Sequence, residues 1–432
     1  MGEESKEKDH PYINEIIISK KQNKWLLRLE TLGIVIVMAV IFGFVARWAF
    51  LSSDGYLREL LGVEEERQKV DLPRFTVDND VTSSTDETQG TVVHQNLVPT
   101  ILPIDGKNSY TNMYEEIRQL SQHISNSIAI VEVIEQGVDW FQQTYETKTW
   151  TTGVVLAQDG VHLLILTDLE KISKENLIQV YFGEAKVSGQ VYAIDKDYGL
   201  AIIAVTLSNI SKEVFQQITF ARFEEDAIIV GTPILALGGP NGYKNSMEVG
   251  MVTSLGDNIG VVDGELSYFT TNVTDYMNGN GFIFNFSGEV MGMITHTHKK
   301  NREDAVCSAI YLEDIRSVIV SLLNNTKQTL FGIKGQDVPE SYPWLLKDLS
   351  ELSGVKGVFV TEVQNDSPAL KAGIKAGDII LAVNGKQVEG IMHWKEILLE
   401  CIEGESIQVT FYKNLENQWI ETKVQVKLVG KK

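Results

Sequence analysis

The chain has 432 residues, of which 43% are hydrophobic, 9% aromatic and 22% charged. This length exceeds one usual domain and predicts two or three, and the composition is ordinary for proteins with globular cores. The 38 basic and 58 acidic side chains give a formal net charge of -20, which argues against nucleic acid or an anionic membrane surface as a ligand.

The N-terminal region contains one segment long enough to cross a lipid bilayer. Residues 32–51, LGIVIVMAVIFGFVARWAFL, are apolar except for Arg47, and about 20 apolar residues are what a transmembrane helix needs. A cleaved signal peptide is the alternative, but the run is longer than a usual signal hydrophobic region and no small-x-small cleavage site follows it. Four basic residues precede the span: Lys20, Lys21, Lys24 and Arg28. Because acidic residues dominate after it, the positive-inside rule predicts a cytoplasmic tail over residues 1–31 and an extracytoplasmic location for the rest.

Residues 52–112 are predicted to connect this span to the first folded domain. The stretch VDNDVTSSTDETQGT within them is polar, acidic and poor in periodic apolar residues, which is typical of a flexible tether. Leucines at near-helical spacing over residues 56–70 favour a short helix beside the membrane. Helical spacing returns over residues 113–127, directly before an apolar run typical of a strand.

Short apolar runs separated by glycine, aspartate and asparagine turns predict two antiparallel barrels within residues 113–325. The strands of the first barrel are expected at residues 127–135, 151–156, 163–167, 177–182, 186–193 and 200–205. The strands of the second barrel are expected between residues 228 and 310, followed by a closing helix over residues 312–323. Two such barrels pack with a cleft between them.

Five blocks of sequence in this region carry a resemblance to a known family. They are TTGVVLAQDGVHLLILTDLEKI from Thr151, GQVYAIDKDYGLAIIAV from Gly189, ARFEEDAIIVGTPILALGGPNG from Ala221, MEVGMVTSLG from Met247 and TNVTDYMNGNGFIFNFSG from Thr271. In content and order they resemble the trypsin-like serine proteases of the HtrA group. The resemblance covers roughly residues 115–428 and implies a mainly β fold, a chymotrypsin-like double β-barrel followed by a PDZ domain.

The loop that carries the family's catalytic serine is recognisable here, but the serine is missing. Aligned without a gap from Phe284 and Asn285, the serine position is Gly279 and the oxyanion-hole glycine is Met277. A glycine has no oxygen with which to attack a carbonyl. A residue other than glycine at position 277 resists the turn that directs the backbone N–H into the oxyanion hole.

The other two catalytic positions of the family are replaced as well. The aspartate position is Gly199, and the histidine position is Glu170 if a short insertion after Gly160 is allowed, or Thr167 without it. Neither glutamate nor threonine replaces imidazole as the base that activates a serine. Asp168 and Glu170 resemble a carboxylate pair, which we interpret as surface charges in a turn.

The C-terminal part, residues 328–428, resembles a PDZ domain. The block DSPALKAGIKAGDIILAVNGKQV from Asp366 matches the PDZ signature, with a short strand over residues 379–383 that leads into an Asn-Gly turn. The resemblance implies a carboxylate-binding loop that offers backbone N–H groups to a peptide terminus, formed by Leu330, Phe331, Gly332 and Ile333. PDZ domains bind peptides by strand addition, here facing a helix over residues 392–401. Two interpretations stay open for three residues of that helix, the peptide pocket and the domain core: Trp394, Ile397 and Leu398.

No cofactor and no metal site is expected. His162 is interpreted as a half-buried strand residue, and His296 and His298 as members of a solvated loop, since no third metal ligand is evident beside them. Cys307 and Cys401 lie in different predicted domains, so each is expected to be a small buried apolar residue.

Together these features predict a membrane-anchored HtrA-like pseudoprotease of the cell envelope. Its expected partners are the C-termini of peptides and of unfolded envelope proteins, bound by the PDZ domain in protein quality control or stress signalling. One alternative is an active endopeptidase with an unrecognised nucleophile. The other is a regulatory subunit of mixed HtrA trimers, and a homo-trimer also stays open.

Overall fold

The computed structural model describes residues 68–72, 108–138, 140, 144–173, 176–256, 258–296, 306–338, 355–415 and 418–431. Residues from Arg67 onward form one compact unit. Among the described residues, no helix has the length and apolar character to cross a membrane. The predicted span over residues 32–51 and most of the predicted tether lie outside the described residues.

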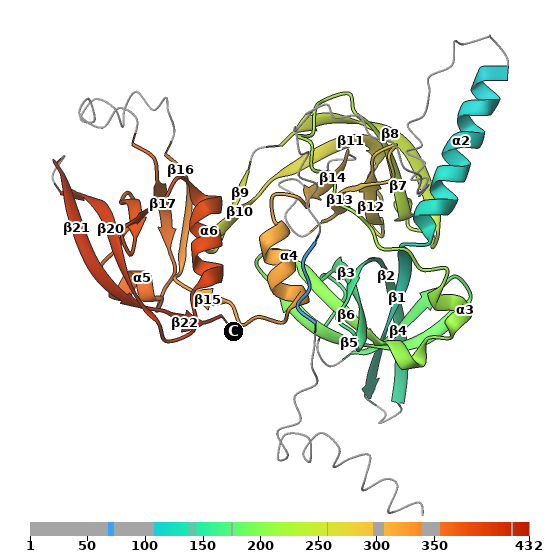
Figure 1. Cartoon of the computed structure of the whole chain (residues 1–432), viewed down its shortest axis with the longest axis horizontal. Helices are drawn as coiled ribbons and strands as arrows, with labels where there is room; N and C mark the ends of the chain where they lie inside the picture. Colours follow the sequence, from blue (N-terminus) through green and yellow to red (C-terminus); the bar gives the residue numbers. More distant parts are fainter. Residues whose placement is uncertain are drawn as a thin grey trace, which may run out of the picture. The chain divides into compact units, whose positions relative to one another are not determined.

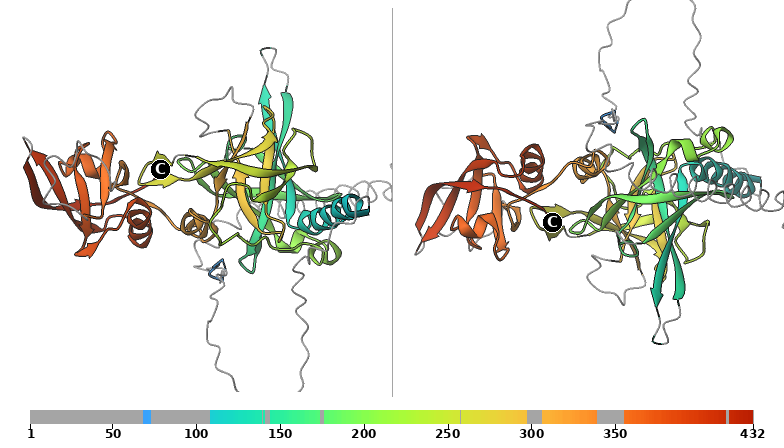
Figure 2. Two further views of the ribbon diagram at one scale, coloured as in Figure 1. Left: turned by 90° about the horizontal axis from the view of Figure 1, so that it is seen from above. Right: turned by 90° about the horizontal axis from the view of Figure 1, so that it is seen from below.

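Six antiparallel strands close the first barrel in the order β1-β2-β3-β6-β5-β4 (Figure 1). Their bounds are β1 (Ile128–Val138), β2 (Thr144–Gln158), β3 (His162–Asp168), β4 (Leu177–Phe182), β5 (Ala185–Asp195) and β6 (Leu200–Thr206). Each strand predicted from the sequence is present. The pair β1 and β2 extends further than expected, as a hairpin that protrudes from the barrel (Figure 2). The polar residues of β2 before Trp150 are exposed there and therefore carry no burial signal.

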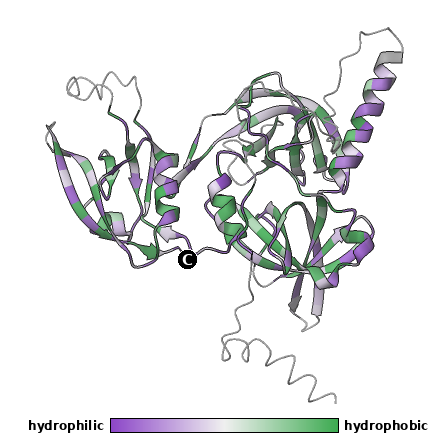
Figure 3. Cartoon of the chain, in the orientation of Figure 1, coloured by the Kyte–Doolittle hydropathy of each residue, from purple (hydrophilic) through white to green (hydrophobic). Residues whose placement is uncertain are grey.

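Alternating side chains of β3 explain why all of its residues are buried. Leu163 and Ile165 belong to the core inside the first barrel, whereas Leu164 and Leu166 belong to a core that also contains residues of the second barrel. Successive side chains of a strand point to opposite faces, so a strand buried on both faces reads as a continuous apolar run. Figure 3 shows this apolar character in β3 and β6.

The second barrel has the strand order β11-β14-β13-β12-β7-β8. Its strands are β7 (Pro233–Gly239), β8 (Ser246–Leu255), β11 (Tyr268–Thr274), β12 (Asn280–Phe284), β13 (Val290–Ile294) and β14 (Val306–Tyr311). A separate two-stranded hairpin, β9 (Ile259–Val261) and β10 (Gly264–Leu266), lies in the chain between β8 and β11.

Helices complete the described part of the two-barrel region: the 18-residue α2 (Asn108–Ser125) and the shorter η1 (Leu207–Asn209), α3 (Lys212–Phe215) and α4 (Arg316–Leu323). Helix α2 starts at Asn108 rather than at residue 113, and the closing helix α4 starts at Arg316 because residues 312–315 form a turn. The apolar residues of that turn are nevertheless buried in the core, so the apolar pattern alone overstated the length of the helix.

Residues 68–72 fall in the predicted flexible tether, and residues 68–70 also end the predicted helix over residues 56–70. The structure shows no helix at residues 68–70, and residues 68–72 are packed against the two-barrel region. Val70 and Leu72 are buried in the core shared by the barrels. The Asn324 side chain accepts a hydrogen bond from the Val70 N–H at 3.0 Å and donates one to the Val70 carbonyl at 2.8 Å. Arg316 donates to the Leu72 carbonyl at 3.1 Å. Two apolar residues in a polar stretch are too few for sequence periodicity to reveal this contact.

The C-terminal sheet has the order β16-β17-β18-β20-β21, with β19 paired to β18, so β16 is an edge strand. The elements of this domain are β15 (Thr329–Leu330), β16 (Ile333–Asp337), β17 (Val358–Val363), α5 (Pro368–Lys371), β18 (Ile379–Val383), β19 (Lys386–Gln387), α6 (Ile391–Glu400), β20 (Ser406–Leu415), β21 (Gln418–Lys427) and β22 (Val429–Gly430). Strands β15 and β22 pair in a separate two-stranded sheet. Strand β18 has the predicted bounds. The Asn-Gly turn after it is also present, with positive φ at Asn384 and Gly385.

Candidate functional site

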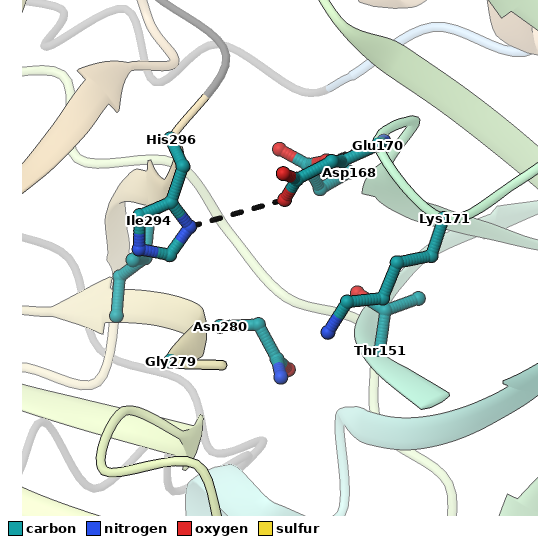
Figure 4. A pocket seen from close by; sticks show the side chains of 8 residues that line it. All are labelled: Thr151, Asp168, Glu170, Lys171, Gly279, Asn280, Ile294 and His296. Carbon is teal, nitrogen blue, oxygen red and sulfur yellow. Dashed lines mark hydrogen bonds and ion pairs between the residues drawn. The ribbon is translucent and has the colours of Figure 1, made fainter. Parts of the chain in front are cut away.

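A small pocket contains residues from both barrels (Figure 4). Its lining consists of Thr151, Asp168, Glu170, Lys171, Gly279, Asn280, Ile294 and His296. Two predicted triad positions, Gly279 and, with the insertion allowed, Glu170, therefore lie in one pocket, whereas the alternative histidine position Thr167 does not line it. The third, Gly199, is adjacent in space, because its carbonyl accepts a hydrogen bond at 2.9 Å from the N–H of Leu169. The structure thus brings the predicted positions together.

His296 is a pocket residue rather than a member of a solvated loop, which corrects the sequence interpretation. It follows β13, and its side chain is only 17% exposed. Its Nε2 is 2.9 Å from Asp275 Oδ1, and its Nδ1 is 3.9 Å from Glu170 Oε2. The hydrogen bond with Asp275 raises the pKa of His296, and the charge of Glu170 acts in the same direction against the opposing effect of burial. His298, which the sequence analysis assigned to the same loop, lies outside the described residues.

Asp168, interpreted above as a surface charge, ends β3 and is buried, with 8% of its surface exposed. Its Oδ1 accepts a hydrogen bond from the Glu170 N–H at 2.6 Å. Burial raises the pKa of Asp168 to about 6, and the negative charge of Glu170 contributes in the same direction. Only Glu170, with 47% of its side chain exposed, fits the interpretation as a surface charge.

Asn280 is the pocket residue that sequence comparison missed, because the alignment assigned it only to a glycine position. Its side-chain oxygen accepts hydrogen bonds from the Thr152 N–H at 2.9 Å and from the Thr152 hydroxyl at 2.6 Å. Its side-chain N–H donates to the Asn278 carbonyl at 3.1 Å. Since Asn280 begins β12 and Thr152 lies in β2, this side chain joins the second barrel to the first.

The backbone at Gly279 has no room for a side chain. A Cβ added there would lie 2.5 Å from the Pro240 carbonyl oxygen and 2.9 Å from the Tyr276 carbonyl oxygen, and both are backbone atoms. The Gly279 N–H donates to the Tyr276 carbonyl at 2.7 Å. The side chain of Met277, at the position of the oxyanion-hole glycine, is 93% exposed. Residues 276–279 therefore form a closed turn.

Thr151 carries the one hydroxyl among the residues that line this pocket. It is 2% exposed, and its oxygen lies 3.4 Å from the Thr167 hydroxyl, which in turn donates to the Thr152 carbonyl at 2.8 Å. Within the described ranges, the Thr151 hydroxyl makes no hydrogen bond to His296. The pocket can hold and exchange a proton on an imidazole between carboxylates, but it offers no hydroxyl bonded to that imidazole.

The remaining histidine and cysteine residues lie outside the pocket. His162 is fully buried rather than half-buried, and its Nδ1 is 3.2 Å from Asp159 Oδ2. Cys307 is buried, whereas Cys401 is only partly buried, and neither forms a disulfide. In the part of the chain that the structure describes, no group of three or more histidine, cysteine, aspartate or glutamate side chains is arranged to hold a metal ion.

The predicted carboxylate-binding loop of the C-terminal domain does bind a carboxylate, namely that of Asp263 in the β9–β10 hairpin. The N–H groups of Phe331 and Gly332 donate to Asp263 Oδ2 at 2.8 and 2.9 Å. Gly332 also donates to Oδ1 at 2.9 Å, as does Ile333 at 3.0 Å. Leu330 instead lies in β15 and pairs with Val429.

Glycine is required at position 332 by both conformation and space. Its φ of 95° is one that other residues rarely adopt. A Cβ there would lie 2.3 Å from the Cβ of Ser367. The sequence TLFGIKG thus forms the loop because its glycine permits the turn that points consecutive N–H groups at one acceptor.

The three candidate pocket residues of α6 are buried in the core of this domain: Trp394, Ile397 and Leu398. The Trp394 ring packs edge-to-face on Phe331, with 4.7 Å between the ring centroids. Of the two interpretations left open by the sequence, the geometry therefore favours the core. Trp394 packs against Phe331 of the carboxylate-binding loop.

Comparison with known proteins agrees with this architecture. The family model for the PDZ domain matches residues 326–424. The chain is 26% identical over 319 residues to "Serine protease Do-like HtrB" of Bacillus subtilis, covering 70% of this chain and 68% of that protein. It is 25% identical over 296 residues to "Serine protease Do-like HtrA" of Lactobacillus helveticus, covering 65% and 69%.

A third relative is "Probable periplasmic serine protease do/HhoA-like" of Haemophilus influenzae, with 28% identity over 214 residues, 48% of this chain and 45% of that protein. Among solved structures, "HtrA-type protease AlgW with decapeptide" superposes with a TM-score of 0.52 at 16% identity, over 72% of this chain and 99% of that one. This structural likeness supports the fold. The chain is therefore HtrA-like, with a double-barrel serine protease fold followed by a PDZ domain.

Proposed function

We propose that this chain is an HtrA-like pseudoprotease that acts by binding polypeptide C-termini through its PDZ domain. The observation that carries the proposal is the closed turn at Gly279. In active serine proteases, a serine attacks the substrate carbonyl and backbone N–H groups of the same loop stabilise the oxyanion. Here the residue at the serine position has no side chain, and its N–H is bonded to the Tyr276 carbonyl.

The rest of the pocket supports the same proposal. A general base must be neutral to accept a proton from a nucleophile. His296 lies between Asp275 and Glu170, and its raised pKa favours the protonated form. The Thr151 hydroxyl is bonded to Thr167 instead of to this imidazole. An active endopeptidase would need a different arrangement of the turn, of the base and of a nucleophile.

Location and partners are part of the proposal. The apolar residues 32–51 are long enough to anchor the chain in a membrane, and the basic residues before them favour a cytoplasmic N-terminus. The name of the Haemophilus influenzae relative places that protein in the periplasm. We therefore assign the two barrels and the PDZ domain to the extracytoplasmic side, where the C-termini of unfolded envelope proteins are the ligands.

The test is turnover of unfolded protein by the purified full chain in detergent. Casein and a fluorogenic unfolded reporter serve as substrates, and an active HtrA protease serves as the positive control. We expect no turnover by the wild type. A matched pair of variants, Thr151→Val and Thr167→Val, identifies the remaining candidate nucleophile. Turnover that Thr151→Val abolishes and Thr167→Val preserves would establish an active peptidase and overturn the proposal.

A further inference from the structure

The β9–β10 hairpin occupies the place where a PDZ domain binds its peptide. Peptides add as a strand to the free edge of the strand that follows the carboxylate-binding loop, opposite the facing helix. That strand is β16, the edge of its sheet. Hairpin strands β9 and β10 both contact β16, and β10 also contacts α6. The separate hairpin between β8 and β11 therefore already lies against this edge.

Asp263 makes the two kinds of contact that a bound peptide terminus makes, one through a carboxylate and one through a backbone N–H. Its carboxylate accepts hydrogen bonds from three consecutive N–H groups, those of Phe331, Gly332 and Ile333. Its own N–H donates to the Ile333 carbonyl at 2.7 Å, as the main chain of an added strand would. One residue thus supplies the anionic group and the first backbone hydrogen bond that a peptide terminus would supply.

The hairpin turn is shaped to present this carboxylate. Asp263 lies at the tip with a φ of 58°, a conformation for which aspartate is one of the tolerated residues. Its surface is 1% exposed. A Cβ on the next residue, Gly264, would lie 2.0 Å from the hydroxyl oxygen of buried Tyr198, so glycine is needed for the turn to approach. Burial raises the pKa of Asp263, and the hydrogen bonds from the loop N–H groups and the charge of Lys395, which is also buried, oppose this rise.

We propose that Asp263 is an internal ligand of the PDZ groove, so that an external polypeptide C-terminus binds only when the β9–β10 hairpin leaves β16. This inference rests on the proposed function for the identity of the external ligand, but the occupancy of the loop can be measured without it. An internal ligand lowers the apparent affinity for an external one, because the intrinsic association constant is multiplied by the fraction of molecules in which the groove is free.

The experiment uses the full chain in detergent and two readouts. Hydrogen exchange measures the protection of the amides of residues 331–333 in the wild type, Asp263→Ala and Asp263→Asn. The matched control is Asp226→Asn, an exposed aspartate of the second barrel region. The second readout is the affinity for peptides selected from a random C-terminal library, each compared with its amidated form, which lacks the terminal carboxylate.

Removal of the Asp263 carboxylate is expected to raise exchange at residues 331–333 at least about tenfold while β18 and β20 remain protected. The same variants should bind free-carboxylate peptides at least about tenfold more tightly than the wild type or Asp226→Asn, a difference of about 1.4 kcal/mol. Unchanged exchange at residues 331–333 overturns the inference, as does equal peptide affinity in all four proteins. Raised exchange without any peptide binding supports the internal ligand and contradicts the proposed function instead.

Discussion

Replacement of Asn280 by alanine is predicted to weaken the junction between the two barrels. The substitution removes the oxygen that accepts hydrogen bonds from the Thr152 N–H and hydroxyl. Both partners are buried, because Thr152 is 1% exposed. A buried donor left without an acceptor costs about 1–3 kcal/mol. The hydroxyl can rotate toward another acceptor but the N–H cannot, so we expect a loss of about 2–4 kcal/mol in total.

Thermal unfolding measures this loss. For a folded region of this size, about 1 kcal/mol corresponds to a change of about 2–4 °C in Tm, so Asn280→Ala should unfold about 5–15 °C below the wild type. Two variants act as controls. Thr152→Val keeps the N–H bond and should lose less, and Asn241→Ala removes a hydrogen bond to the Tyr243 N–H at an exposed turn and should change Tm little.

The reasoning would be refuted if Asn280→Ala unfolded within about 1 °C of the wild type, a change equivalent to less than about 0.5 kcal/mol. That result would mean that water or a neighbouring group replaces the lost acceptor. A drop for Thr152→Val as large as that for Asn280→Ala would mean that the hydroxyl carries the junction, rather than the backbone N–H.

Three further predictions concern single side chains. Burial raises the pKa of Glu265 to about 7 from 4.5, so the wild type should lose stability as the pH rises from 4.5 to 7. The free energy of unfolding of Glu265→Gln should equal that of the wild type at pH 4 and exceed it by about 1–3 kcal/mol at pH 8. A difference that does not change with pH would contradict this prediction. Lys431→Ala removes the ammonium group 3.1 Å from the buried Asp195 carboxylate and should lower the free energy of unfolding by about 3 kcal/mol at pH 7. Burial raises the pKa of Asp195, but the Lys431 charge outweighs it and lowers this pKa. The difference in Tm between the variant and the wild type should therefore shrink as the pH falls below 4. Gly279→Ser should lower Tm and give no casein turnover, because its Cβ meets the Pro240 carbonyl at 2.5 Å; a stable, active variant would show that the turn opens easily.

The strands were predictable because their burial leaves a mark in the sequence. Leu163 to Leu166 form a continuous apolar run since alternate side chains enter two different cores, and β18 lies between turn glycines and an Asn-Gly pair. The loop at Gly332 was predicted from the PDZ resemblance, and its glycine is explained by a positive φ and close contact with the side chain of Ser367. Local signals of this kind survive in a single sequence.

The missed features depend on pairs of residues far apart in the chain. His296 was interpreted as solvated because nothing near it in sequence shows that Asp275 lies 2.9 Å away. Asn280 carries no sign of its bond to Thr152, which is 128 positions earlier. Asp263 lies in a hairpin with strands of three residues each, too short for a periodic pattern, and its partners belong to another domain.

In both the candidate pocket and the PDZ loop, backbone N–H groups are hydrogen-bonded within the chain, but the two sites differ in what must change before an external ligand can bind. At the pocket, the Gly279 N–H is turned toward Tyr276 of its own loop. Freeing it would require a new backbone conformation, and a nucleophile would still be missing. At the PDZ loop, three N–H groups already converge on a carboxylate, so only the occupant has to change. The inference requires the β9–β10 hairpin to leave β16, and a two-stranded hairpin is marginally stable by itself. The PDZ loop thus keeps a geometry that suits exchange of one carboxylate for another, whereas the turn at Gly279 does not suit catalysis, and this difference is why we propose binding rather than proteolysis.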